Sequence, residues 1–257
     1  MKYRGMLLGL SVLLLAGRVP AQEVETIMKA EVYKDAAGES LNYRLYLPDD
    51  IENIKNCPLL LFLHGAGERG LDNTKQLKHC IKDIVLYSKE KKEPVILVVP
   101  QCPENMKWVN VDWSAGSNAM PSSPSVPMKL AKEVVENLAK KYPVDPKRVY
   151  VTGLSMGGYG TWDAIQRWPD FFAAAMPLCG GGDDHLGDKI KGVPIWAFHG
   201  DKDTAVKVDR SRAMIDAIKK SGGNPKYTEY PGGGHDCWTV TFKNPEVLAW
   251  LFAQKKK

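Results

Sequence analysis

The feature that most constrains the fold is a strand, a tight turn and a helix that follow one another within residues 149–165. A β-branched and aromatic run leads into Gly-Leu-Ser155-Met-Gly and then into a helical pattern, the context that a G-x-S-x-G motif requires. Gly153, Gly157 and Gly158 omit side chains where strand and helix would cross closely. The motif predicts an exposed Ser155 hydroxyl beside a helix N-terminus, where backbone N–H groups can receive negative charge. The alternative is a glycine-rich turn without chemistry.

Strands alternate with helices along the rest of the chain, and no repeat or linker divides it into more than one domain. Apolar runs such as residues 58–63 suit central strands covered on both faces. This rhythm predicts an α/β fold with a mostly parallel sheet and helices on both sides. Besides the strand, turn and helix within residues 149–165, the expected strands are residues 26–32, 41–47, 58–63, 95–99, 172–178, 193–198 and 227–230. The expected helices are residues 74–87, 128–142, 208–220 and 245–254, and residues 101–127 are expected to form a long loop.

Residues 1–21 have the pattern of a secretory signal peptide: a basic start with Lys2 and Arg4, an apolar run over residues 6–16, and small residues before a cleavage point. Arg18 stands where a lipoprotein would carry its cysteine, and the apolar run is short for a membrane span. We therefore expect a secreted or periplasmic protein, soluble after cleavage and without stable membrane association. An uncleaved membrane anchor is the alternative.

The formal net charge of +5 falls to +2 when the three basic residues of the signal are removed. The remaining lysines and arginines form no concentrated patch in the sequence, so a nucleic-acid partner is not expected. The sequence leaves the oligomeric state open.

A serine hydroxyl becomes a good nucleophile only when a base takes its proton, so the G-x-S-x-G motif predicts a histidine oriented by a carboxylate. His235 follows the last predicted strand in a glycine-rich turn and is the expected base, with a surface histidine as the alternative. Asp203 lies between Ser155 and His235 after a predicted strand and is the expected acid. Asp201 competes with it but suits a turn-stabilising role better.

The chain contains four motifs in the order His64-Gly-Ala-Gly, Gly-Leu-Ser155-Met-Gly-Gly, His-Gly-Asp-Lys-Asp203 and Gly-Gly-His235. This set resembles the α/β-hydrolase superfamily, and more narrowly secreted carboxylesterases of the phospholipase/carboxylesterase and feruloyl-esterase-like branch, often labelled predicted peptidases. The resemblance covers nearly all of the chain after the signal, so residues 22–257 are expected to form one catalytic domain.

The resemblance also implies roles for particular residues. It assigns the acid to Asp203, the second aspartate of its motif. It places the oxyanion hole at the backbone N–H groups of Met156 and Ala66, and it makes His64 a residue that braces the loop rather than a catalyst. No metal or cofactor is expected, because the histidines and cysteines show no ligand-type clustering; His79 and Cys80 suit packing better than coordination.

Five cysteines in an exported chain cannot all pair internally. Cys179 should end a strand at the edge of the sheet where Cys237 follows His235, so a disulfide between these two is one expectation. The alternative is that all five are small buried hydrophobic residues.

After removal of 21 residues, the remaining 236 leave no room for a large lid. We therefore expect an open cleft shaped by three loops, at residues 101–125, 179–192 and 236–244. Possible substrate contacts are Trp108, Trp113, Trp238 and Glu68, although packing for the tryptophans and an ion pair for Glu68 are the alternatives.

The sequence favours a secreted serine esterase that acts on acyl or feruloyl esters of plant polysaccharide. Two alternatives remain. A serine peptidase of the same fold would use an identical triad on amides, and a non-catalytic carbohydrate-binding relative would keep the fold alone.

Overall fold

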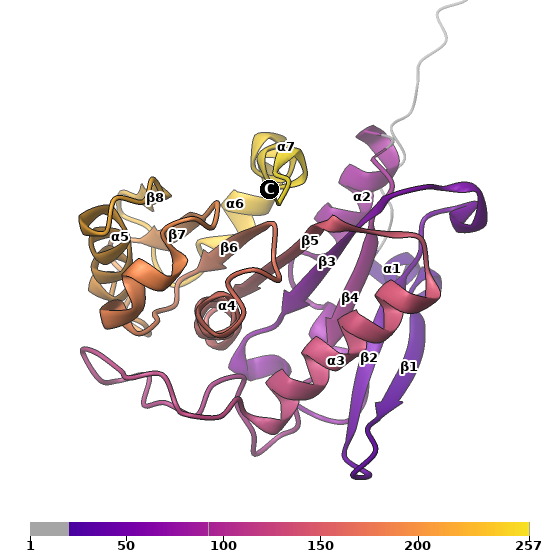
Figure 1. Cartoon of the computed structure of the whole chain (residues 1–257), viewed down its shortest axis with the longest axis horizontal. Helices are drawn as coiled ribbons and strands as arrows, with labels where there is room; N and C mark the ends of the chain where they lie inside the picture. Colours follow the sequence, from indigo (N-terminus) through magenta and orange to yellow (C-terminus); the bar gives the residue numbers. More distant parts are fainter. Residues whose placement is uncertain (1–20, 92, 257) are drawn as a thin grey trace, which may run out of the picture.

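The computed structural model describes residues 21–91 and 93–256, which form one eight-stranded sheet with helices on both faces (Figure 1). The strands are β1 (Lys29–Lys34), β2 (Ser40–Tyr46), β3 (Cys57–Leu63), β4 (Ile96–Pro100), β5 (Val144–Leu154), β6 (Ala174–Leu178), β7 (Trp196–Gly200) and β8 (Lys226–Tyr230). The α-helices are α1 (Ala21–Ile27), α2 (Ile81–Lys91), α3 (Val126–Lys141), α4 (Met156–Arg167), α5 (Asp209–Lys220), α6 (Trp238–Lys243) and α7 (Pro245–Ala253). The predicted signal peptide, residues 1–21, lies outside the described residues except for Ala21.

The sheet is mostly parallel, which confirms the predicted fold class. Its strand order is β1-β2-β4-β3-β5-β6-β7-β8; β2 pairs antiparallel with β1 and β4, and the other neighbours pair in parallel. The chain runs from β3 to β4 on one side and from β5 to β6 on the other. The connections that leave the neighbouring strands β3 and β5 therefore run in opposite directions from the C-terminal edge of the sheet. Ligand sites in open α/β sheets form at such a point.

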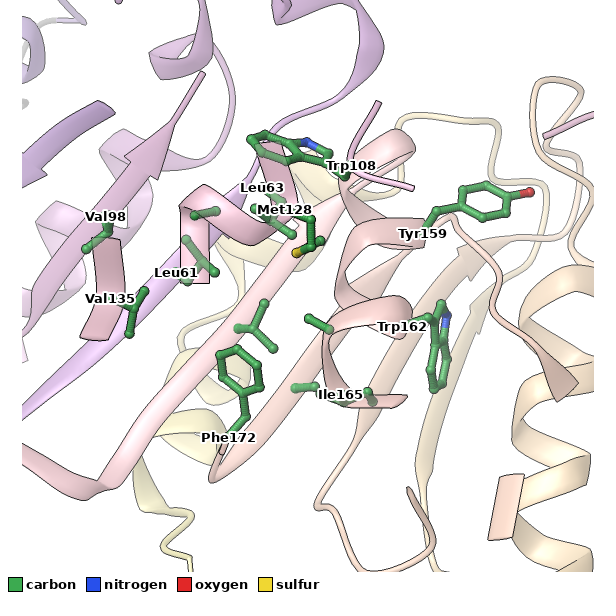
Figure 2. Packing of buried hydrophobic residues seen from close by; sticks show 14 of the residues in the cluster. Leu61, Leu63, Val98, Trp108, Met128, Val135, Tyr159, Trp162, Ile165 and Phe172 are labelled. Atoms are coloured by element: carbon green, nitrogen blue, oxygen red, sulfur yellow. The ribbon is translucent and has the colours of Figure 1, made fainter. Parts of the chain in front are cut away.

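The core lies in two layers, one on each face of the sheet, and alternate residues of β3 contribute to different layers. Leu59, Leu61 and Leu63 belong to the cluster that includes buried side chains of α3, α4 and α5. Leu60 and Phe62 belong to the cluster that includes α1, α2, α6 and α7. Figure 2 shows the first cluster, in which Leu61 and Leu63 face Met128 of α3. Burial on both faces explains the continuous apolar run, and each of these side chains contributes roughly 1.5–3 kcal/mol by leaving water.

The expected long loop is confirmed: residues 101–125 connect β4 to α3 without a helix or strand of their own. Ser125 ends this loop and caps α3, because its Oγ accepts a hydrogen bond from the Met128 N–H over 3.3 Å. The same hydroxyl donates to the Trp108 carbonyl oxygen over 2.7 Å. One side chain thus fixes both the start of the helix and the middle of the loop.

The N-terminal elements begin later than the sequence predicts. Residues 21–27 form α1, so the first strand starts at Lys29 instead of residue 26. The helix expected from residue 74 begins at Ile81, because a short 3-10 helix precedes it and Cys80 has a φ of 65°. A non-glycine residue in that left-handed region interrupts a regular helix.

Two segments predicted as loops contain helices. Asp184–Ile190 forms a 3-10 helix inside the predicted cleft loop at residues 179–192, and α6 occupies most of the predicted cleft loop at residues 236–244. Trp238 and Phe242, four residues apart on α6, are both buried on the same side of the helix. Within residues 21–91 and 93–256 the helices are too short or too polar to span a membrane.

Candidate active site

Ser155 stands at the turn between β5 and α4 with φ 54° and ψ −117°, a backbone conformation that side-chain-bearing residues rarely adopt. The turn is tight because backbones approach one another without intervening side chains. A Cβ atom at Gly153 or at Gly157 would clash with the Leu63 carbonyl oxygen of β3. The Ser155 N–H donates to the Leu178 carbonyl oxygen over 3.0 Å, which ties the turn to β6. The predicted reason for these glycines is confirmed.

Three side chains from distant parts of the chain meet at the C-terminal edge of the sheet. Ser155 Oγ lies 2.9 Å from His235 Nε2, and His235 Nδ1 lies 2.7 Å from Asp203 Oδ2. Ser155 follows β5, Asp203 follows β7 and His235 follows β8, so the structure brings together the three residues that the sequence singled out. The His235 side chain is 26% exposed while the Asp203 side chain is fully buried. Solvent therefore reaches the serine end of this hydrogen-bonded series.

The Asp203 carboxylate faces four nitrogen atoms. Oδ1 accepts from the backbone N–H groups of Ala205 and Val206 over 2.8 and 2.9 Å. Oδ2 faces two imidazoles, His235 Nδ1 at 2.7 Å and His199 Nε2 at 3.2 Å. Burial alone would raise the pKa of the Asp203 carboxyl, but hydrogen bonds from His199, His235 and the Val206 backbone lower this pKa well below its usual range. The carboxylate is therefore ionised at neutral pH.

Asp201, the competing acid, lies in the same loop but has a different partner. Its Oδ1 accepts a hydrogen bond from the Gly232 N–H over 2.7 Å. This contact joins the loop after β7 to the turn that carries His235. Asp201 therefore stabilises the relative position of the two loops, whereas the sequence favoured a role in a turn of its own loop.

The backbone N–H groups of Met156 and Ala66 both lie at helix starts. Met156 is the first residue of α4, and Ala66 is the first residue of the 3-10 helix Ala66–Glu68 after β3. N–H groups at these positions have no partner within their own helix and can donate to a ligand. The β3 loop also approaches the serine, because a Cβ built at Gly65 would lie 3.7 Å from Ser155 Cβ. Met156 directly follows Ser155 at the end of β5, and Ala66 directly follows Gly65 in the neighbouring β3 loop.

His64 stabilises the loop after β3 through hydrogen bonds in the interior. Its Nε2 accepts a hydrogen bond from the Cys102 N–H over 2.9 Å, so the proton is on Nδ1, which donates to the Gly65 carbonyl oxygen over 2.6 Å. The Trp108 Nε1–H donates to the His64 carbonyl oxygen over 3.0 Å. Burial lowers the pKa of His64 to about 4, so the imidazole is neutral. His64 joins the β3 loop to the β4 loop and takes no part in the triad.

The tryptophans of the long loop differ in exposure. The expectation that Trp108 contacts substrate is wrong, because the side chain is 0% exposed and packs edge-on against His64. The packing alternative therefore holds for Trp108. Trp113 is partly exposed, with Lys107 Nζ 4.5 Å from its ring centroid, and its carbonyl oxygen accepts a hydrogen bond from the Tyr159 hydroxyl of α4. Trp113 stays a candidate substrate contact.

Trp238 and Glu68 are both buried and both contact His79. The Trp238 ring stands edge-on to His235, with 5.3 Å between ring centroids, and its other neighbour is His79 at 5.5 Å. Glu68 is 6% exposed, and its Oε1 lies 3.4 Å from His79 Nε2. The expected substrate contact of Glu68 is wrong for this buried carboxylate, which is paired with the His79 imidazole, a contact of the bracing kind that was the alternative. Trp238 packs against the imidazole of His235.

All five cysteines lie within the described residues, and all are free and buried. The expected disulfide between Cys179 and Cys237 is therefore wrong. One group of three potential metal ligands lies together in the described part of the chain: Cys179, Asp203 and His235, with ligand atoms within 4.8 Å of one another. The Asp203 oxygens of this group already accept hydrogen bonds from His235 and from the Ala205 and Val206 backbone.

Sequence reasoning missed His199, which lies beside Asp203 in the interior. The residue stands in the quoted His-Gly-Asp-Lys-Asp203 motif, so the signal was present, but its partners are split between the loop after β7 and Ser211 of α5. Sequence spacing does not reveal contacts of that kind.

The family model described as "Putative esterase" matches residues 35–217 of this chain. A bifunctional acetylxylan esterase/xylanase from Neocallimastix patriciarum is 26% identical over 183 residues, which are 71% of this chain and 24% of the relative. A probable carboxylesterase SOBER1-like protein from Arabidopsis thaliana is 23% identical over 68% of this chain and 71% of the relative. The chain thus spans about a quarter of the length of the first relative.

Solved structures share the architecture. A thermostable esterase has a TM-score of 0.81 and 37% identity, with coverage of 90% of this chain and 64% of that one. A ferulic acid esterase has a TM-score of 0.65 and 20% identity, with coverage of 88% of this chain and 97% of that one. The second likeness concerns the fold alone.

Proposed function

This chain belongs to the esterase family, with the α/β-hydrolase fold, and we propose that it hydrolyses carboxylic esters through an acyl-enzyme formed on Ser155. The observation that carries the proposal is the continuous series of hydrogen bonds from Ser155 Oγ to His235 and on to Asp203, at 2.9 and 2.7 Å. A hydroxyl, an imidazole and a buried carboxylate in that series form the unit that activates a serine.

In the first half of the reaction, Ser155 Oγ attacks the ester carbonyl carbon while His235 Nε2 takes its proton. His235 then returns this proton to the leaving alcohol as the carbon–oxygen bond breaks. Water repeats the sequence on the acyl-enzyme: His235 takes a proton from water, the acid is released, and the Ser155 hydroxyl is restored. Proton and bond changes balance over the two halves without an external reductant or oxidant.

Asp203 and the N–H groups of Met156 and Ala66 would stabilise the charges that develop during the reaction. The ionised carboxylate accepts the Nδ1–H of His235, which leaves Nε2 as the base and stabilises the imidazolium that forms. The N–H groups of Met156 and Ala66 would receive the oxyanion of the tetrahedral intermediate. Loss of one such donor costs about a hundredfold or more in rate in comparable enzymes.

For the substrate we propose acyl or feruloyl esters attached to plant polysaccharide. Support comes from the relative whose name includes acetylxylan esterase and from the likeness in fold to a ferulic acid esterase. The partly exposed Trp113 offers an aromatic face to a phenolic acyl group or sugar ring. The signal-like pattern at residues 1–21 fits a secreted or periplasmic enzyme that meets such polymers outside the cell.

A substrate panel tests this proposal. Hydrolysis rates would be measured on methyl ferulate, acetylated xylan, short and long p-nitrophenyl acyl esters, and a peptidyl anilide. We expect turnover of the ferulate or the acetylated polymer, and none of it in Ser155→Ala. Turnover confined to long-chain lipid esters would overturn the substrate class, and turnover of the anilide without the esters would identify a peptidase.

The choice of acid is tested by two matched variants. Asp203→Asn should lower kcat by about four orders of magnitude, because the amide holds the imidazole in the wrong tautomer. Asp201→Asn keeps the oxygen that accepts from the Gly232 N–H and should keep most of the activity. A large loss in Asp201→Asn alone would reverse the assignment.

A further inference from the structure

His199 is a fully buried histidine for which the proposed reaction has no step. It lies on β7, four residues before Asp203, and its side chain is 0% exposed. Its Nε2 is 2.9 Å from the Val206 carbonyl oxygen and 3.2 Å from Asp203 Oδ2, and its Nδ1 is 2.8 Å from Ser211 Oγ. A buried imidazole with a partner on every side has one fixed orientation.

The contacts of His199 determine where its proton lies. Both neighbours of Nε2, the Val206 carbonyl oxygen and the Asp203 carboxylate, can only accept hydrogen bonds. Nε2 must therefore carry a proton: it donates to the Val206 carbonyl oxygen, and Asp203 Oδ2 lies 3.2 Å from the same nitrogen. On the other side, Ser211 Oγ lies between Nδ1 and the Gly180 carbonyl oxygen, at 2.8 and 3.1 Å. His199 is thus a permanent donor toward Asp203.

His199 Nε2 lies beside Asp203 Oδ2, the carboxylate oxygen that accepts the hydrogen bond from His235. Asp203 Oδ2 accepts the N–H of His235 on one side and has His199 Nε2 3.2 Å away on the other. The backbone donors of Ala205 and Val206 hold only Oδ1. Rotation of the carboxylate about its Cβ–Cγ bond would break both sets of contacts. His199 therefore opposes movement of Oδ2 away from His235 and helps to keep the buried carboxylate ionised.

We propose that His199 is a positioning residue for the catalytic acid: it aims Asp203 Oδ2 at His235 and acts on the rate only through that carboxylate. The inference rests on the proposed function of Asp203. It differs from a purely structural role in one respect. A brace for the fold would change stability and substrate affinity alike, whereas a residue that positions the acid changes kcat and leaves KM as it is.

Two substitutions separate these roles because they place an amide at different ends of the imidazole. In His199→Gln the amide reaches the position of Nε2 and can donate to Val206 and Asp203. In His199→Asn it reaches only the position of Nδ1, near Ser211. We expect His199→Asn to lower kcat by about ten- to a hundredfold, the usual worth of a hydrogen bond to a charged group, with KM unchanged. His199→Gln should stay close to wild type.

The dependence on Asp203 is tested by repeating His199→Asn in the Asp203→Asn background. If His199 acts through the carboxylate, its substitution costs little further activity there. Equal losses in both backgrounds, or equal losses in the Gln and Asn variants, would overturn the proposal. The Ser155→Ala variant is the reference: if it still turns over ester, the proposed function itself fails, whatever the His199 variants do.

If neither His199 variant folds, a spectroscopic measurement on proteins that keep His199 tests the proposal. Nitrogen-15 spectra of labelled wild type should show His199 protonated at Nε2, and Asp203→Asn should shift that Nε2–H resonance. An Nε2 resonance that is unprotonated, or that is the same in both proteins, would contradict the proposal.

Discussion

Burial of His64 makes the stability of this fold depend on pH in a way that can be calculated. The side chain is 1% exposed, and its Nε2 is already engaged as an acceptor from the Cys102 N–H. Protonation would place a charge in the interior and remove that acceptor, so burial lowers the pKa of His64 to about 4. In the unfolded chain the same imidazole has a pKa of about 6.5.

A folded-state pKa below the unfolded-state value means that the unfolded chain binds the proton first. The contribution of His64 to stability is therefore fully present above pH of about 6.5 and is lost as the pH falls toward the folded pKa of about 4. The shift corresponds to a total of about 3 kcal/mol, of which about 2 kcal/mol is already lost at a pH of about 5.

Urea unfolding of wild type and His64→Gln at three pH values between 8 and 5 would measure this contribution. The free energy of unfolding should fall more steeply in wild type, by about 2 kcal/mol over the whole range. His185→Gln is the matched control, because His185 is exposed and its substitution should leave the wild-type slope. Parallel curves for wild type and His64→Gln would refute the reasoning.

Three further changes probe the packing around the site. Gly157→Ala should lower the free energy of unfolding by about 3 kcal/mol or more and abolish activity, because a Cβ there would overlap the Leu63 carbonyl oxygen; Gly192→Ala, which meets nothing within 4 Å, should be tolerated, and equal effects would contradict the account. Trp108→Phe should cost about 1–3 kcal/mol in urea unfolding, since the buried His64 carbonyl oxygen loses its donor, without a change in KM; a raised KM would return Trp108 to the substrate site. Titration with a thiol reagent should find no reactive thiol in the folded protein and five after unfolding without reductant, whereas three would reveal a disulfide.

The strand–turn–helix unit around Ser155 could be predicted from the sequence because steric exclusion acts locally. Three glycines around one serine, between an apolar run and a helical pattern, leave few backbone paths. The structure shows the reason for Gly157, which lies where a Cβ would overlap the backbone of β3. The central strands could also be predicted, because burial on both faces produces a continuous apolar run that is visible in the sequence alone.

The helix α6 could not be predicted in the same way. Its sequence, Trp-Thr-Val-Thr-Phe-Lys, contains three β-branched residues, whose intrinsic helix propensity is low. The helix forms because Trp238 and Phe242 are buried together when they lie one turn apart. That gain depends on the rest of the core, so tertiary packing overrides local preference here.

The surroundings of the triad were beyond sequence reasoning for a related reason. A tryptophan on a long loop can face solvent or the interior, and the hydrogen bond from Trp108 to the His64 carbonyl oxygen decides the matter. Likewise, the partners of His199 come from the loop after β7, from α5 and, through Ser211, from the loop after β6. Contacts of this kind exist only once the sheet has formed.

The account depends most on Ser155 being the activated nucleophile. A fluorophosphonate reagent reacts with such a serine, and mass spectrometry of a protease digest would locate the adduct. We predict one adduct in wild type, on the peptide that contains Ser155, and none in Ser155→Ala. An adduct on another residue, or no adduct on folded wild-type protein, would contradict the account.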